Sequence, residues 1–298
     1  CPNVVFLNYT NPMSMLCKAM QTLCPEVDVT GLCHSVQHTS NMLKKWSEKE
    51  GELKYLCLGI NHQAFFTEIT VDGEDIYPII REKIKEEEIY NSEKVRNEIF
   101  KTFGYYVTES SGHNSEYCAW FRKRPDLIEK FCTGTSWNPG EYAFSLKLRS
   151  NPDRYDNSIK WFLDNPVNKE KSNEYAANIL NARIGDGEPF PFNANVLNNG
   201  TIENLPYDAC VEIPVIADKK GYTRTFKGKM PSGPATLCSY TANIENLVFE
   251  AFMEKSKAKV IQAVALDPLC SAVLSLEEVT NMCEELFEIN KEYLGEYK

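Results

Sequence analysis

The sequence predicts an α/β (α+β) fold in which helices pack on a mixed sheet. Short apolar runs alternate with segments of helical spacing over residues 3–60, which is typical of strands and helices that follow one another. Two amphipathic helices are expected near the carboxyl end, over about 240–259 and 275–294. Hydrophobic residues make up 43% of the 298 residues, which is enough for a substantial core.

The first part of the chain predicts strands and helices in alternation. The run NVVFL is expected to be a buried strand, which the Asn-Pro turn of NYTNPM ends. The segment AFFTEITVDGED, residues 64–75, predicts a further strand with an Asp-Gly turn. Because ligands of α/β sheets bind at the carboxyl ends of strands, Asn8, Cys33 and His62 form a first group of candidates. The bounds expected before residue 64 are strand 3–7, helix 13–24, strand 27–33, helix 37–49 and strand 56–60.

The middle of the chain contains longer polar stretches. No linker and no internal repeat divides it, so a single catalytic domain over 1–298 is expected. Two helices are expected, a charged one with a solvated face over 78–103 and another over 150–182. The other expected elements are a polar and aromatic loop over 104–117, a Gly/Pro/Asn-rich loop over 185–206 and a strand over 209–217.

Charge and hydropathy exclude two classes of partner. The chain carries 32 Lys and Arg against 42 Asp and Glu, for a net charge of −10, and has no basic cluster with which to neutralise phosphates. No apolar run reaches the roughly 20 residues that span a bilayer. We therefore expect no nucleic-acid partner and no membrane partner. The sequence starts with Cys1 rather than Met, and a longer protein is expected.

The eleven cysteines are odd in number, irregularly spaced and without a CxxC pair. This usage is typical of a reduced, cytoplasmic protein with free thiols rather than of a secreted disulfide scaffold. Cys57, Cys238 and Cys270 lie in apolar contexts and are expected in the core.

Cys33 and His62 suggest three kinds of chemistry. A thiolate and an imidazole at two strand ends suit a divalent transition metal. The pattern alone favours a buried cysteine and a histidine with satisfied hydrogen bonds. A nucleophile and base pair is the third interpretation. For Cys33 and the adjacent His34 that pair is disfavoured, because consecutive strand residues point to opposite faces.

The segment 104–117 gathers groups that can supply acids, bases and hydrogen bonds to a sugar. An ordinary polar loop with an aromatic anchor is the alternative interpretation. A tyrosine acts as a base only if its pKa is lowered, and a nearby divalent cation favours this. The residues concerned are Tyr105, Tyr106, Glu109, His113, Asn114, Glu116 and Tyr117.

Seven motifs in order carry a resemblance to a known family. Together they resemble the NAD- and manganese-dependent glycosidases of glycoside hydrolase family 4, over nearly the whole chain. The CHSV form of the cysteine motif resembles the α-galactosidase branch, since the phospho-glucosidase branches usually carry Asp or Asn after the cysteine. The motifs are NYTNPM (8–13), GLCHSV (31–36), GINHQAFF (59–66), SSGHNSEY (110–117), NNGTIENLP (198–206), VEIP (211–214) and ALDPLCSAVLSLEEV (265–279).

The resemblance implies a reaction and a fold. It implies hydrolysis of melibiose-like α-galactosides through oxidation at C3 by NAD, removal of the C2 proton and elimination at C1, an exception to the usual mechanism with two carboxylates. It also implies the C-terminal part of a fold like that of lactate and malate dehydrogenases. The Rossmann unit with its GxGxxG fingerprint, which begins such proteins, has no counterpart in the sequence. NAD binding and turnover by this chain alone are therefore in question.

The resemblance also implies roles for single residues. Cys33 and His62 match the two ligands of the manganese ion. The catalytic base is expected at Tyr106, with Tyr105 as the near alternative and Glu109 as the acidic alternative of other branches. A homodimer or homotetramer is expected.

The remaining candidates concern the substrate and the cofactor. Asn11 matches an asparagine that contacts the substrate near the nicotinamide of NAD. His34, His113 and Asn114 are candidates for contacts with sugar hydroxyls, and His38 is expected on a surface helix without a role.

Two other function classes stay open. A 2-hydroxy-acid dehydrogenase has a related architecture, and it predicts a histidine paired with an aspartate and arginines that bind the substrate. A fragment without catalytic activity, which binds only metal or a partner, is the other.

Overall fold

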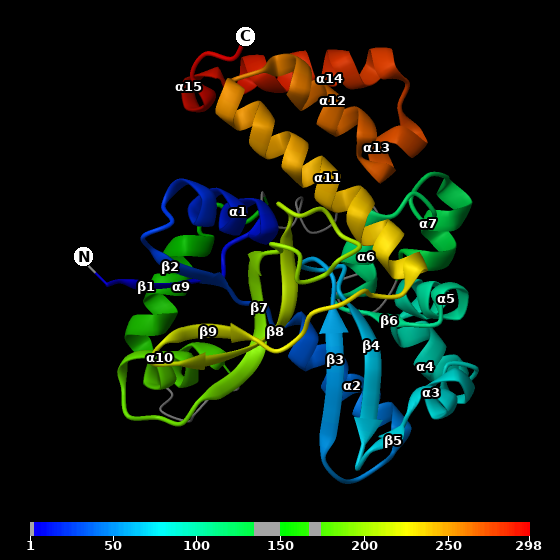
Figure 1. The fold of residues 1–298 in the computed structure, drawn as a ribbon. Helices are drawn as coiled ribbons and strands as arrows, with labels where there is room; N and C mark the ends of the chain where they lie inside the picture. The colour runs from blue at the N-terminus through cyan, green and yellow to red at the C-terminus, as the bar shows by residue number, and fades with distance from the viewer. Residues whose placement is uncertain (1–2, 134–149, 167–173) are drawn as a thin grey trace.

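The computed structural model describes residues 3–133, 150–166 and 174–298, and its strands form two sheets with helices around them (Figure 1). The predicted α/β fold with a mixed sheet is confirmed. Strands β1 and β2 run parallel, and the other paired strands are antiparallel.

The larger sheet has the order β1-β2-β7-β8-β9. The expected strands 3–7, 27–33 and 209–217 all belong to it, with small shifts of their ends. The expectation that the first of them is buried was wrong, because β1 is the edge strand of the sheet and Phe6 is exposed. The bounds are β1 Val5–Asn8, β2 Asp28–Gly31, β7 Phe190–Leu197, β8 Cys210–Asp218 and β9 Gly221–Arg224.

The smaller sheet has the order β3-β4-β5, with β6 paired to β4. The predicted Asp-Gly turn connects β4 and β5, and both Asp72 (φ 49°) and Gly73 (φ 81°) have the left-handed backbone that such hairpin turns require. The bounds are β3 Leu53–Leu58, β4 Phe65–Val71, β5 Glu74–Asp75 and β6 Tyr106–Val107.

One backbone pair joins the two sheets. Gly59, just after β3, exchanges two hydrogen bonds with Glu212 near the start of β8, with N–O distances of 3.2 and 2.9 Å. A side chain at Gly59 would collide with the backbone of Ala64, because its added carbon would lie 2.7 Å from Cα. The pair brings the loop after β3 beside the carboxyl end of β2.

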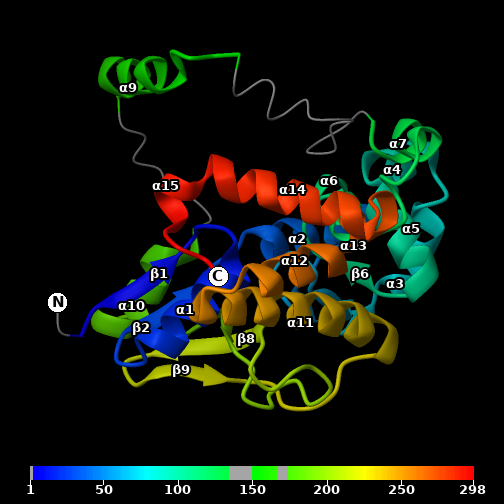
Figure 2. The same cartoon turned by 90° about the horizontal axis from the view of Figure 1, so that it is seen from above.

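Helices pack around the sheets, and α11 to α15 form a layer at one end (Figures 1 and 2). The predicted helices 13–24 and 37–49 correspond to α1 and α2, and the two predicted near the carboxyl end fall on α11 to α15. The bounds are α1 Met13–Leu23, α2 Ser35–Ser47, α3 Tyr77–Lys83, α4 Glu87–Ser92, α5 Lys94–Phe103, α6 Ser111–Tyr117, α7 Pro125–Phe131, α9 Arg154–Asp164, α10 Tyr175–Ile184, α11 Ser232–Glu254, α12 Lys257–Leu266, α13 Pro268–Val273, α14 Leu276–Ile289 and α15 Lys291–Leu294.

Two expectations about local structure were wrong, and a third was confirmed only in part. The expected loop 104–117 contains β6 and α6, and α6 begins where the Ser110 hydroxyl accepts a hydrogen bond from the backbone N–H of His113. The expected loop 185–206 contains β7, which pairs with β8 along eight residues. The expected helix over 150–182 is α9 and part of α10, and residues 167–173 lie outside the described residues.

The charged helical stretch 78–103 is not solvated throughout. Glu93 and Arg96 are buried, and an ion pair of 2.7 Å joins them at the start of α5. Arg96 also donates to the hydroxyl of Thr39 on α2. A buried ion pair that keeps such further hydrogen bonds is costly to break from one side. It therefore holds α2 and α5 together.

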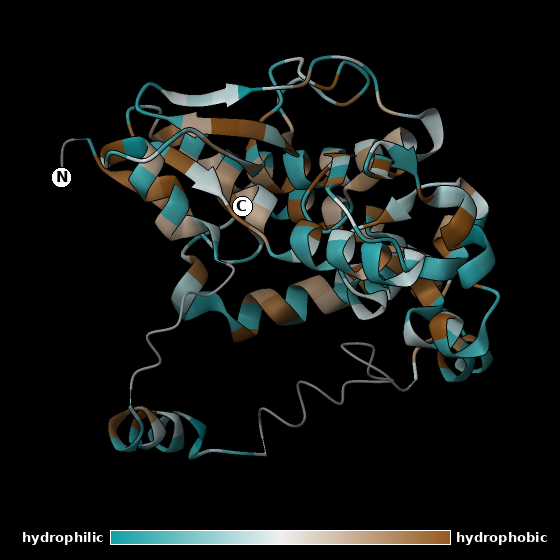
Figure 3. Cartoon of the chain, turned by 90° about the horizontal axis from the view of Figure 1, so that it is seen from below, coloured by the Kyte–Doolittle hydropathy of each residue, from teal (hydrophilic) through white to brown (hydrophobic). Residues whose placement is uncertain are grey.

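Several large apolar side chains are exposed, and α9 carries a group of them. Figure 3 shows apolar residues on this helix, which lies apart from the others, and Trp161, Phe162 and Leu163 are all largely exposed. Cys57 and Cys238 are buried in the core as expected, whereas Cys270 is only partly buried. Within the described ranges, no helix has the length and apolar character needed to cross a membrane.

Candidate active site

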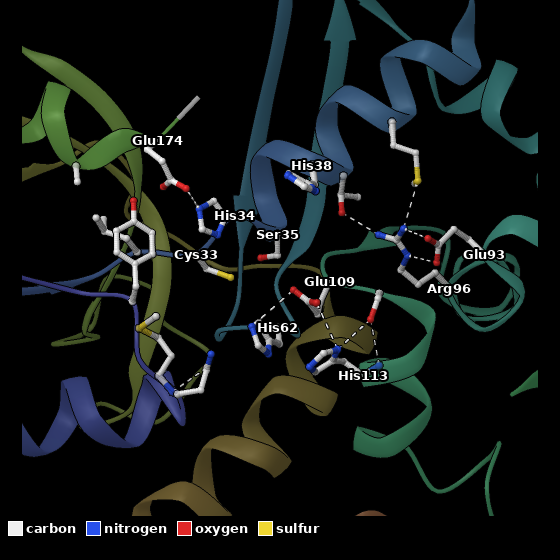
Figure 4. A pocket seen from close by; sticks show the side chains of 18 residues that line it. Cys33, His34, Ser35, His38, His62, Glu93, Arg96, Glu109, His113 and Glu174 are labelled. Carbon is white, nitrogen blue, oxygen red and sulfur yellow. Dashed lines mark hydrogen bonds and ion pairs between the residues drawn. The ribbon is translucent and has the colours of Figure 1, made fainter. Parts of the chain in front are cut away.

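A cavity of about 880 Å³ opens where the loops after β1, β2 and β3 meet helices α2, α5 and α6 (Figure 4). All four histidines of the chain line it, although they come from three separate segments. The lining residues used below are Tyr9, Asn11, Cys33, His34, His38, His62, Glu93, Arg96, Glu109, His113 and Glu174.

Cys33, His62 and Glu109 form a cluster at one side of this cavity. One side-chain ligand atom from each lies within 4.8 Å of the other two. The His62 and Glu109 side chains are only 12% and 20% exposed. Burial raises the pKa of the Cys33 thiol, and the negative charge of Glu109 raises it further. A bound cation would reverse this effect, so the thiolate, imidazole and carboxylate fit a divalent transition metal.

An uncommon backbone conformation sets the direction of the His62 and Glu109 side chains. His62 and Glu109 both have a φ of 65°, a left-handed conformation that is uncommon for residues other than glycine. Such conformations cost free energy and tend to occur at functional sites. At Glu109 the cost is offset by Asn114, whose amide donates to the carbonyls of Thr108 (2.8 Å) and Ser110 (3.1 Å).

Asn114 is therefore not placed as the sequence predicts. Its side chain is fully buried beneath the turn of Glu109 and does not line the cavity. Both hydrogen bonds that its amide donates go to the backbone of that turn.

Two neighbouring groups orient the His62 ring. Its Nδ1 lies 2.9 Å from the hydroxyl of Tyr117, and its Nε2 lies 3.6 Å from a carboxylate oxygen of Glu109. A metal-binding histidine is usually oriented through its other ring nitrogen in this way. His113 completes the group, with Nδ1 at 2.9 Å from the Ser110 hydroxyl and 3.4 Å from Glu109 (Figure 4).

The tyrosines expected to supply the base lie elsewhere. Tyr106 is 0% exposed, and its hydroxyl donates to the side-chain carbonyl of Asn97 at 3.0 Å. Burial raises the pKa of Tyr106, which opposes its use as a base. Tyr105 packs against the core and is not among the lining residues. The position of Tyr106 does not fit the role, whereas the acidic alternative Glu109 lines the cavity.

The other end of the cavity is built from Tyr9, His34 and Glu174. The His34 Nε2 lies 2.6 Å from a carboxylate oxygen of Glu174, and the Tyr9 ring stacks on His34 with centroids 5.3 Å apart. Asn11 also lines the cavity, and its side-chain oxygen accepts a hydrogen bond from the backbone of Met13. His38 lines it as well, so the expectation of a mere surface position was incomplete.

Sequence reasoning missed Glu93, Arg96 and Glu174. The first two are three residues apart on a helix and oppositely charged, a spacing that could have suggested their ion pair. Their burial had no local signal, because the surrounding residues are as charged as on any solvated helix. Glu174 likewise meets His34 only through the tertiary fold.

Comparisons with known proteins agree with this architecture. Residues 57–270 match the family described as the family 4 glycosyl hydrolase C-terminal domain, and residues 1–48 match family 4 glycosyl hydrolase. An α-galactosidase of Bacillus subtilis (strain 168) is 38% identical over 100% of this chain and 68% of its own length. An α-galactosidase of Rhizobium meliloti (strain 1021) is 33% identical over 99% of this chain and 62% of its own length. The chain thus spans about two thirds of the length of these relatives.

A solved structure shares the fold. The 6-phospho-α-glucosidase from gut microorganisms, crystallised in complex with NAD and Mn²⁺, superposes with a TM-score of 0.75 at 20% identity. The match covers 100% of this chain and 69% of that one. At this identity the likeness establishes the fold alone.

Proposed function

Since the chain belongs to the family 4 glycosyl hydrolases, we propose that it hydrolyses α-galactosides of the melibiose type with NAD and manganese as cofactors. The observation that carries the proposal is the convergence of Cys33, His62 and Glu109 in one cavity. The two α-galactosidases, at 38% and 33% identity, support this choice of substrate. The six-residue motif around Cys33 supports it further.

Residues of the cavity would hold the two cofactors, the divalent ion and NAD. Cys33 and His62 would bind the divalent ion, and Asn11 faces the same cavity as a candidate contact near the nicotinamide. When bound, NAD accepts a hydride from C3 of the sugar and the ion stabilises the oxygen at C3, which together make the hydrogen at C2 acidic.

Glu109 is our candidate for the base that removes the C2 proton. Its carboxylate lies beside the ion-binding groups, and Asn114 holds its turn in place. Removal of that proton by Glu109 would allow the group at C1 to leave, and Glu109 would return a proton to C2 after water has added at C1. His34 and His113 line the cavity at its two ends and are our candidates for hydrogen bonds to sugar hydroxyls.

The charges of the cavity favour a neutral sugar. Among the described lining residues, Arg96 is the single Arg or Lys, and it already binds Glu93, Thr39 and Met42. A phosphate or a uronic-acid carboxylate would meet Glu109 and Glu174 without a free arginine or lysine from this set. The same observation disfavours a 2-hydroxy-acid dehydrogenase, which would need an arginine to bind its substrate.

Two coarser expectations belong to the same proposal. All cysteines among the described residues are free thiols, which supports a reducing, cytoplasmic location. We also propose a homodimer or homotetramer, as the resemblance implies.

Hydrolysis of p-nitrophenyl α-galactoside tests the proposal directly. With NAD, Mn²⁺ and a thiol reductant we expect turnover that stops when either cofactor is omitted, and incorporation of solvent deuterium at C2. A 6-phospho-α-glucoside and an α-galacturonide serve as competing substrates, and faster hydrolysis of either would reject the galactoside. Mn²⁺ binding without turnover of any of the three would instead favour a fragment that lacks catalytic activity.

A further inference from the structure

Glu212 is a fully buried acid with little compensation for its carboxyl. Its side chain on β8 is 0% exposed, and neither carboxylate oxygen has a hydrogen bond of good geometry among the residues that the structure describes. Leaving a buried ionised carboxylate uncompensated is costly, and a protonated one would still need an acceptor for its hydrogen. The buried carboxyl of Glu212 therefore needs a further interaction partner to offset the cost of its burial.

The fold places this acid beside the candidate ion-binding cluster. The backbone of Glu212 pairs with Gly59, at the start of the loop that carries His62. Burial raises the pKa of the Glu212 carboxyl well above its usual value, the charges of Cys33 and Glu109 raise it further, and the charge of His62 lowers it, so the carboxyl and the cluster interact electrostatically. The side-chain amide of Asn61, which follows Gly59 by two residues, interacts both with the Glu212 carboxyl and with the Cys33 thiol.

Glu212 does not line the cavity, so a substrate in the cavity would not touch it. It also lies outside the set of side chains whose ligand atoms approach within 4.8 Å of one another. Glu212 is therefore neither a cavity-lining residue nor a member of the close ligand cluster, and the Gly59 backbone pair is what ties it to the loop of His62. Acids in such outer positions raise the affinity of the ligands for their ion.

We propose that Glu212 is a positioning residue that strengthens divalent-cation binding at Cys33 and His62 by supplying a buried negative charge behind them. The inference rests on the ion site of the proposed function. It adds a role for a strand residue that neither binds the sugar nor belongs to the close ligand cluster.

Direct binding of Mn²⁺ tests this role without any need for turnover. We would measure the dissociation constant of Mn²⁺ by calorimetry and by electron paramagnetic resonance, for the wild type and for E212Q, which keeps the shape and removes the charge. The expected result is an affinity about 10–100-fold weaker for E212Q. E212D, which keeps the charge, should retain more of the affinity than E212Q. As a matched control, E245Q removes an acid from α11 outside the cavity and should bind Mn²⁺ like the wild type.

Thermal unfolding separates this role from a merely structural one. Without Mn²⁺, E212Q should unfold at the same temperature as the wild type or higher, because an uncompensated acid is gone. With Mn²⁺, its melting temperature should rise less than that of the wild type. If E212Q does not fold, E212M removes the same charge with an apolar side chain and takes its place.

The outcomes separate the two proposals. Equal Mn²⁺ affinity of the wild type and a folded charge-free variant would overturn the role of Glu212 alone. Failure of the wild type to bind Mn²⁺ would overturn the ion site and the proposed function with it.

Discussion

The ligand atoms of Cys33 and His62 lie within 4.8 Å of each other, although the two residues follow strands of different sheets. Cys33 follows β2 of the larger sheet, and His62 follows β3 of the smaller one. The backbone pair of Gly59 and Glu212 joins the sheets and brings the two loops together. The proximity of a thiol and an imidazole at this junction is the basis of the metal-site prediction.

The first prediction concerns the thiol of Cys33. Replacing the sulfur with a weaker oxygen ligand in C33S should weaken Mn²⁺ binding by at least about tenfold, since even the loss of outer groups costs about 10–100-fold. Calorimetric titration of the purified protein measures this. Cys24, at the end of α1 and outside the cavity, provides the control variant C24S. Equal Mn²⁺ affinity in C33S and C24S would contradict the assignment.

The second prediction separates two roles for Glu109. If it is the base, E109Q should bind Mn²⁺ within a few-fold of the wild type and lose solvent exchange at C2 by about 10²–10⁴-fold. Deuterium incorporation followed by mass spectrometry measures the exchange. The exposed Glu116, in the same segment, provides the control E116Q. A large loss of Mn²⁺ affinity in E109Q would show instead that Glu109 is a ligand.

A third prediction tests the buried position of Tyr106. Y106F removes the hydrogen bond to Asn97 and should lower the free energy of unfolding by about 1–3 kcal/mol, while kcat for the galactoside stays within a few-fold of the wild type. Chemical denaturation and steady-state kinetics provide both values. A loss of kcat of a hundredfold or more in a variant that is still folded would restore Tyr106 as the base.

Glu245 on α11 predicts a dependence of stability on pH. Burial raises the pKa of its carboxyl to about 8, and a hydrogen bond from Ser14 and the charge of Lys18 oppose the rise only in part. In the unfolded chain the carboxyl titrates near 4.5, so the folded state holds the proton more tightly. Its contribution to stability is complete below pH 4.5 and is lost as the pH rises to about 8.

Replacing this acid should remove that loss. Relative to the wild type, E245Q should gain about 2–4 kcal/mol of unfolding free energy at pH 8.5 compared with pH 4.5, less than the full pKa shift implies because the residue is partly exposed. Urea unfolding at both values of pH measures it. E285Q, on the exposed part of α14, should show no such gain. If E245Q and the wild type differed in unfolding free energy by the same amount at pH 4.5 and pH 8.5, the raised pKa of Glu245 would be refuted.

Local patterns predicted the elements whose stability is largely local. The apolar runs of β1, β2 and β8 and the helical spacing of α1 and α2 identified them to within a few residues. The prediction for the segment of β7 was wrong, because the Asn, Pro and Gly residues in and around it are typical of a loop. Pairing with β2 on one side and β8 on the other, which no local pattern reports, makes it a strand.

The sequence by itself determined which side chains can bind a metal or transfer a proton. It also determined that Cys33 and His62 each follow the end of a strand. Only the tertiary structure decided which residues meet. In the folded chain Tyr106 and Asn114 are buried, and a carboxylate oxygen of Glu109 lies 3.6 Å from the His62 ring. Glu212 is paired through its backbone with the loop that carries His62. The physical reason is that periodicity reports which face of an element is buried, whereas the meeting of side chains depends on contacts between distant segments such as Gly59 and Glu212.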